Sequence, residues 1–105
     1  MYMMILMTAS SKEEGEKIIQ KLLEEHLIVC GNILDSVTSL FWWEGKIDKS
    51  KEVLCVLKTK AALFSPVEKR IKILHSYEVP EIIGLPIQEG SPAYLRWIDE
   101  TLKGK

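Results

Sequence analysis

Apolar residues along the chain gather either in short continuous runs or at every third or fourth position. The first run, Tyr2 to Met7, has no polar face and predicts a buried strand. Ser11 and Glu14 then form an S-x-x-E capping pattern, which predicts the start of a helix. Gly15 lies on the inward face of that helix, where a missing side chain allows close packing. The other apolar residues of this face recur at helical spacing: Ile18, Ile19, Leu22, Leu23 and Leu27.

A long β-hairpin is predicted next. Residues 28–43 are rich in Val, Ile, Thr and aromatic residues, interrupted at positions 35–36, which predicts one strand bent or bulged in its middle. The segment Glu44-Gly45-Lys46 predicts the turn. After a polar stretch over 48–52, residues 53–57 predict the returning strand.

Two more helices and one strand complete the chain. Ser65 and Pro66 mark the first turn of the second helix. Residues 82–87 predict a fourth strand, and Ser91-Pro92 predicts the start of a closing helix. The inward residues of these two helices are Leu63, Phe64, Val67, Ile71 and Leu74 in the first, and Leu95, Ile98 and Leu102 in the second.

This order of elements predicts a single α+β domain over residues 1–105. It is the ferredoxin-like β-α-β-β-α-β plan with an added C-terminal helix. In that plan the first and third strands are central and the other two lie at the edges, where Pro86 of the fourth strand is tolerated.

The two central strands carry apolar side chains on both faces, although the helices of this plan cover only one. Such a bare second face exceeds the apolar patch that a soluble monomer normally exposes, and the closing helix is too short to cover it. We therefore expect another subunit to cover it. The residues of this second face are Met4, Leu6, Leu54 and Val56, opposite to Met3, Ile5, Val53 and Cys55.

Composition narrows the classes of function. The 14 Lys and Arg residues are balanced by 15 Asp and Glu residues, so the basic excess of a nucleic-acid-binding protein is missing. No apolar run is long enough to span a membrane, and no secretory signal precedes the first strand, which predicts a cytoplasmic protein. Cys30 and Cys55 lie in strand-like runs without a CxxC motif. A disulfide is one interpretation, and two reduced thiols are the favoured one.

Few residues suggest chemistry. The chain has two histidines, neither at metal-ligand spacing, and it contains no hydrolase, phosphate-loop or dinucleotide-binding motif, so we do not expect an enzyme. The methionines of the first strand suit either a soft metal or an irregular core, and we favour the core. The loop at 75–81 is the densest polar segment, and its side chains either form a site or satisfy the loop backbone. Lys58 is the cation expected to lie partly buried near it.

Trp42 and Trp43 stand side by side in a strand and must face opposite sides. Only one of them can pack against the core. Because tryptophan is enriched at interfaces, we expect the hairpin tip, with Glu44, to contact another subunit. A strand of about 16 residues spans roughly 50 Å, more than a sheet of this domain needs, so the hairpin should overhang.

Several segments, taken in order, cover nearly the whole chain and form a recognisable pattern. They are TAS at 8–10, LIVCGNI at 27–33, TSLFWWEGKI at 38–47, EVLCVLKT at 52–59, LHSYEVPEIIGLPI at 74–87 and YLRWI at 94–98. The aromatic-E-G-K run followed by H-x-Y-x-x-P-E is long and specific. Together these segments resemble the CutA family of divalent-cation tolerance proteins.

The resemblance implies a ferredoxin-like fold and a homotrimer similar in architecture to the PII signalling proteins. It also implies a response to Cu²⁺ or another divalent cation, although no cation is a required cofactor and no enzymatic reaction is established for the family. Members with copper sites carry a cysteine where this chain has Met7 and adjacent histidines where it has Leu74 and His75. The resemblance therefore implies metal contacts from His75 and Met7 only, and weak binding.

Two functions follow as hypotheses. The first is a homotrimeric, metal-associated tolerance protein that binds neither nucleic acid nor membrane. The second is a PII-like sensor that binds a small anionic metabolite between subunits through Lys58, His75, Tyr77 and Glu81.

Overall fold

A four-stranded antiparallel sheet forms the centre of the computed structural model, which describes residues 1–104. The strands lie in the order β2-β3-β1-β4, so β1 and β3 are central and β2 and β4 are the edges, as the sequence predicts. The elements in chain order are β1 (Tyr2–Ala9), α1 (Lys12–Glu24), β2 (Cys30–Trp43), β3 (Lys46–Lys60), a 3₁₀ turn (Ala61–Leu63), α2 (Phe64–Leu74), β4 (Ile82–Ile87) and α3 (Pro92–Thr101).

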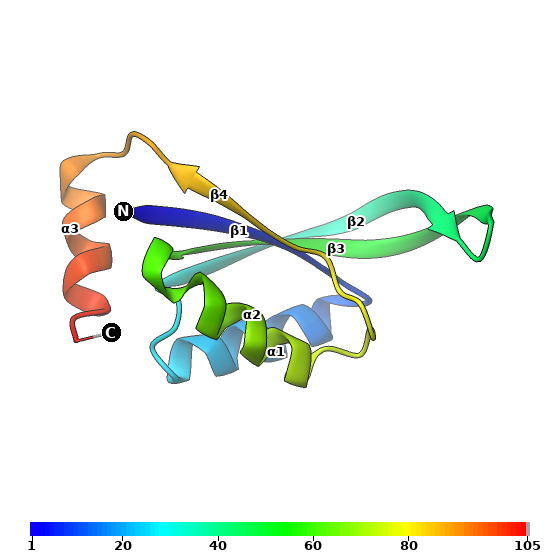
Figure 1. Ribbon diagram of the computed structural model, residues 1–105, viewed down its shortest axis with the longest axis horizontal. Helices are drawn as coiled ribbons and strands as arrows, with labels where there is room; N and C mark the ends of the chain where they lie inside the picture. Colours follow the sequence, from blue (N-terminus) through cyan, green and yellow to red (C-terminus); the bar gives the residue numbers. More distant parts are fainter. Residues whose placement is uncertain (105) are drawn as a thin grey trace.

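One face of the sheet is covered by helices α1 and α2, which lie side by side beneath it (Figure 1). The core fills this space, and Gly15 sets the distance between α1 and β3, since a side-chain carbon there would lie 3.1 Å from the Cys55 sulfur. Helix α3 stands at the end of the sheet and closes the core with Ile98 and Leu102. The predicted α+β fold class is confirmed.

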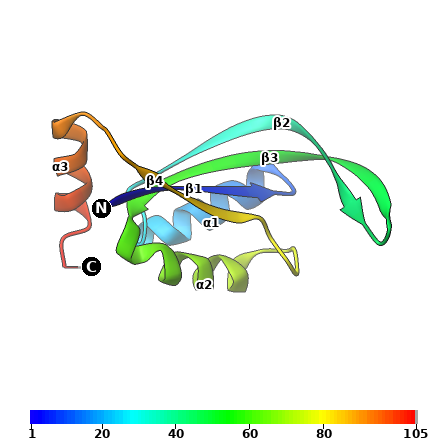
Figure 2. The same ribbon diagram turned by 45° about the horizontal axis from the view of Figure 1, so that its top comes forward.

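The opposite face of the sheet, which we call the open face, is not covered by α1 or α2 (Figure 2). Its apolar side chains alternate with the fully buried core residues along β1 and β3 and are half-buried or exposed, and Ile83 is 49% exposed. The prediction of an uncovered second apolar face is confirmed. The face consists of Met4, Leu6, Leu34, Leu54, Val56, Ile83 and Leu85.

The β2-β3 hairpin extends well beyond the helices and gives the molecule a length of 44 Å (Figure 1). Its register shifts between Leu34 and Val37, which is the bulge predicted at positions 35–36, and Ser36 there has a positive φ of 59°. Glu44 and Gly45 form the turn with φ values of 48° and 78°, as a tight hairpin turn requires. The predicted overhang is therefore present.

Four predictions need correction. β3 begins at Lys46, because the polar segment 48–52 pairs with β2 where nothing covers either face. β1 runs two residues past Met7. Neither hairpin tryptophan joins the core, since Trp42 is 73% and Trp43 60% exposed on the projecting arm. Ser91 precedes α3 but its side chain makes no capping hydrogen bond.

Candidate functional site

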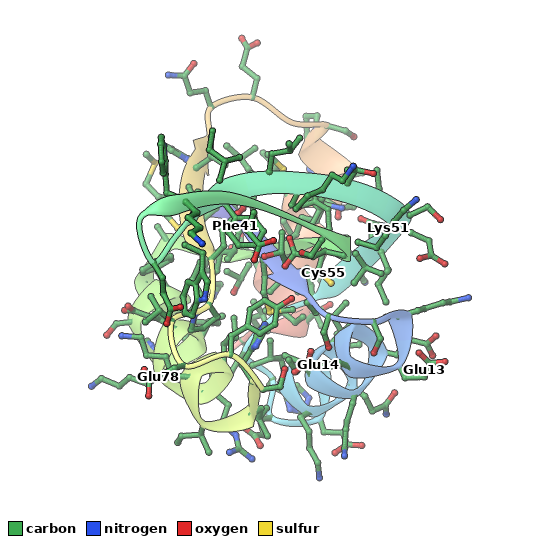
Figure 3. The ribbon with its side chains drawn as sticks, turned by 90° about the vertical axis from the view of Figure 1, so that its right-hand side faces the viewer. Glu13, Glu14, Phe41, Lys51, Cys55 and Glu78 are labelled. Atoms are coloured by element: carbon green, nitrogen blue, oxygen red, sulfur yellow. The ribbon has the colours of Figure 1, made fainter. Side chains whose placement is uncertain are left out.

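Glu14 links the first turn of α1 to the loop after α2. Its Oε1 accepts hydrogen bonds from the backbone N–H and the hydroxyl of Ser10, at 3.0 and 2.7 Å. Its Oε2 accepts one from the backbone N–H of Ser76 at 2.7 Å. The predicted cap is half confirmed, since Ser11 accepts from the Glu14 N–H at 3.1 Å while the carboxylate bonds elsewhere. In Figure 3, Glu14 lies at the start of α1 beneath the sheet that carries Cys55.

His75 follows α2 and lies next to Glu14. It caps the C-terminus of α2 and is only 8% exposed. Its Nε2 lies 2.8 Å from the carbonyl oxygen of Thr8, so Nε2 carries the proton and donates it. Its Nδ1 accepts a hydrogen bond from the backbone N–H of Tyr77 at 3.0 Å. Both ring nitrogens are thereby engaged within the chain.

Tyr77 extends the cluster to the sheet. Its ring lies 4.6 Å from the His75 ring, centroid to centroid, and its hydroxyl donates to Oε2 of Glu52 on β3 at 2.7 Å. The loop after α2 is therefore fixed to both α1 and β3. We call Glu14, Glu52, His75 and Tyr77 the loop cluster.

Burial and hydrogen bonding set the charges of the loop cluster. Burial alone would raise the pKa of Glu14, but the hydrogen bonds from Ser10 and Ser76 outweigh it and lower that pKa to about 2. Burial, followed by the Glu52 and Glu14 carboxylates, raises the pKa of Tyr77. Burial and the charge of Glu14 also raise the pKa of the Cys55 thiol, to about 11. The cluster thus holds an ionised carboxylate beside a protonated phenol and a protonated thiol at neutral pH.

The structure brings together only part of the predicted site. His75 and Tyr77 are neighbours, whereas Lys58 lies on the open face because it alternates with the buried Leu57, and its expected place near the loop was wrong. Glu81 is exposed just ahead of β4 and forms none of the cluster's hydrogen bonds. A site that uses all four residues would need more than one copy of the chain.

A metal ion fits this arrangement poorly. Coordination at Nδ1 of His75 would displace the Tyr77 N–H, and the side chain of Met7 is fully buried in the core. Within residues 1–104, no three His, Cys, Asp or Glu side chains gather as a group that could hold a metal ion.

The sequence did not indicate Glu14 and Glu52 as members of the cluster. Glu14 belonged to the S-x-x-E capping pattern, but that pattern predicted only a local role in capping the helix. Glu52 belonged to the polar segment that was not expected to be a strand. Cys30 and Cys55 do not form a disulfide with each other, and of the two thiols that were expected to be buried, Cys55 is buried whereas Cys30 is half-buried.

The hairpin tip presents a second candidate surface. Beyond the bulge its large apolar side chains are exposed, and no helix reaches them (Figure 1). An isolated chain gains nothing from such an arm, because each apolar group there remains in water. These residues, with Glu44 at the turn, are Leu40, Phe41, Trp42, Trp43 and Ile47.

Comparison with known families agrees with this architecture. The family model described as "CutA1 divalent ion tolerance protein" matches residues 3–101. The chain belongs to this family. The description names tolerance of divalent ions and names no reaction.

The relatives and solved structures bearing the family name are similar over most of this chain. The divalent-cation tolerance protein CutA of Archaeoglobus fulgidus is 43% identical over 98% of this chain and 100% of the relative, and its solved structure, described as periplasmic, has a TM-score of 0.95. The Thermus thermophilus protein is 40% identical over 92% of this chain and 94% of the relative. A chloroplastic CutA of Oryza sativa is 34% identical over 94% of this chain, which spans 56% of it. None of the helices within residues 1–104 is long and apolar enough to cross a membrane.

Proposed function

We propose that this CutA-family chain acts as a homotrimer in divalent-cation tolerance, without catalysing a reaction. The single observation that carries the proposal is the combination of an uncovered apolar sheet face with a projecting aromatic arm. Both features belong to one chain, and a closed ring of identical copies can cover each with the other. The number three is the one that the family resemblance implies.

Cation binding by the single chain is proposed to be weak. The only imidazole in the loop cluster belongs to His75, and a cation would have to displace the Tyr77 N–H from its Nδ1. Imidazole suits Cu²⁺, but one imidazole without a second strong ligand makes a poor site. This geometry therefore does not support a tolerance mechanism in which the chain sequesters the cation tightly.

Titration calorimetry with Cu²⁺ tests this proposal on the wild type and on His75→Ala. We expect a dissociation constant no tighter than about the micromolar range, and a further loss of affinity in the variant. His26→Asn is the matched control, because His26 is the other histidine, is exposed and has a positive φ of 56° that Asn tolerates. Nanomolar binding, or the same affinity in His75→Ala, would contradict the proposal.

We also propose a cytoplasmic location. Two free cysteines, one half-buried and one buried, support a reducing compartment. We propose this location only for this chain, because the relative from Archaeoglobus fulgidus is described as periplasmic and the plant relatives as chloroplastic. Fractionation of cells that express the protein at its natural level would test it, with recovery from the membrane or an exported fraction as the contradicting result.

A further inference from the structure

The projecting hairpin leaves the four-stranded sheet at a defined level. Ala9, the last residue of β1, pairs with Val53, so outward from Glu52, among the strands of residues 1–104, β3 pairs with β2 alone. The bulge of β2 lies at the same level, because Val37, the first paired residue after it, lies opposite Glu52. We call positions 34–37 and 52–53 the arm root. A two-stranded ribbon twists more strongly than a wide sheet and a bulge adds a bend, so contacts at the arm root decide the direction of the arm.

A side chain from outside the hairpin holds the arm root. Tyr77 donates a hydrogen bond from its hydroxyl to Oε2 of Glu52 at 2.7 Å. The loop that carries Tyr77 lies near the end of β1, where the hairpin leaves the rest of the molecule (Figure 1 and Figure 2). The hydroxyl therefore contacts β3 at the level where β1 ends and stops supporting it.

Tyr77 is itself fixed from inside the chain. Its ring lies 4.6 Å from the His75 ring, centroid to centroid, and its backbone N–H donates to Nδ1 of His75 at 3.0 Å. The neighbouring Ser76 N–H donates to Glu14 at 2.7 Å. The side chain of His75 is 0% exposed, so it is enclosed by the atoms of its own chain. Because of this enclosure, the anchor remains in place when another copy covers the open face or the arm.

We propose that Tyr77 is a positioning residue for assembly, which fixes the direction of the arm through its hydrogen bond to Glu52. The inference rests on the proposed homotrimer. In it, the apolar side chains of the hairpin tip supply the contact area, and Tyr77 sets where that area points. Direction matters because every copy of a closed ring must contact the next at the same angle. An arm that is free to swing must be ordered in each copy on assembly, which weakens association.

Sedimentation over a dilution series tests the effect on assembly. Tyr77→Phe removes only the hydroxyl, and it should raise the protein concentration at half-assembly about tenfold, because every copy loses the hydrogen bond. Glu52→Gln keeps a carbonyl oxygen that can accept from Tyr77, so it should stay within about threefold of the wild type. Tyr2→Phe is the matched control. It removes a hydroxyl that donates to Asp99 at the same distance of 2.7 Å, at the other end of β1, and it should assemble like the wild type.

A second measurement follows the arm in the single chain. Spin labels are placed at Lys49→Cys on the arm and Lys69→Cys on α2, both exposed positions, in a chain with Cys30→Ser and with both hairpin tryptophans replaced by Ala. This background avoids labelling at Cys30 and removes the large side chains through which another copy would hold the arm. The distribution of the distance between the labels should be narrow, and Tyr77→Phe should broaden it. Tyr2→Phe should leave it narrow.

Two results would overturn the inference. One is a Tyr77→Phe variant that assembles at the same concentration as the wild type, and the other is a label distance that stays equally narrow in it. A purely structural role for Tyr77 would lower the stability in urea and leave both readouts unchanged. A wild type that stays a single chain at every concentration would contradict the homotrimer instead, and the label distance would still decide whether Tyr77 directs the arm. Should Tyr77→Phe fail to fold by circular dichroism, Glu52→Leu breaks the same hydrogen bond and replaces it in both measurements.

Discussion

Replacing Glu14 with Gln is expected to lower the free energy of unfolding at pH 7 by about 3 kcal/mol, because the pKa of Glu14 falls from 4.5 to about 2 on folding and each pKa unit corresponds to about 1.4 kcal/mol. The variant keeps the size of the side chain. It replaces one carboxylate oxygen by an amide NH₂, so the side chain can no longer accept hydrogen bonds from both Ser10 and the Ser76 backbone N–H.

The effect should depend on pH in a defined direction. A carboxylate whose pKa is lowered by folding stabilises the protein above its unfolded pKa, and the stabilisation is lost as the pH falls toward the folded pKa. The difference between wild type and Glu14→Gln should therefore shrink from about 3 kcal/mol at pH 7 to about 1.4 kcal/mol at pH 3. Urea unfolding at one fixed protein concentration measures it.

Glu13→Gln is the control for this comparison. Glu13 stands beside Glu14 in the first turn of α1 but is exposed (Figure 3). Its substitution should cost less than about 1 kcal/mol, through the helix dipole alone. Equal losses in the two variants, or a Glu14→Gln deficit that stays constant from pH 7 to pH 3, would show that the hydrogen bonds of Glu14 do not hold the loop cluster in place.

Removing both hairpin tryptophans should weaken assembly and leave the fold of the single chain intact. Trp42 and Trp43 are mostly exposed, so Ala at both positions removes little from the chain's own core. A truncated interface tryptophan costs on the order of 2 kcal/mol, and a closed trimer repeats the loss in every copy. We expect the protein concentration at half-assembly to rise by at least about 100-fold. Sedimentation over a dilution series measures it.

The control removes an apolar side chain of comparable exposure from the helix layer. Ile73 on α2 is 74% exposed, on an element that covers the other face of the sheet. Ile73→Ala should assemble like the wild type. The proposal of an interface arm fails if the double tryptophan variant also assembles normally, or if it loses its secondary structure at every concentration.

The sequence predicted the order of the elements because each one carried its own periodicity. The continuous apolar runs gave β1 and the inner part of β3, and Pro86 marked β4 as an edge. The bulge was predicted because Asp35 and Ser36 interrupt an apolar strand. These signals are local, so they could be recognised without knowing what each segment contacts.

The loop cluster could not be predicted in the same way, because its partners are far apart along the chain. Glu14 and Ser76 are joined by a hydrogen bond across 62 positions, and Tyr77 and Glu52 across 25. The neighbouring sequence does not distinguish Glu14 from a solvent-exposed residue at a helix start, or Glu52 from a solvent-exposed residue of a polar strand. Lys58 was placed near the loop from the end of its strand alone. The alternation of β3 turned it to the open face.

Light scattering after size exclusion, at micromolar concentration, tests the central claim most directly. A homotrimer of this 12.0 kDa chain predicts a mass of about 36 kDa. The uncovered apolar face and the exposed aromatic arm would then both be accounted for. A mass of 12.0 kDa at that concentration would contradict the account, because it would leave both surfaces in water in the stable form of the protein.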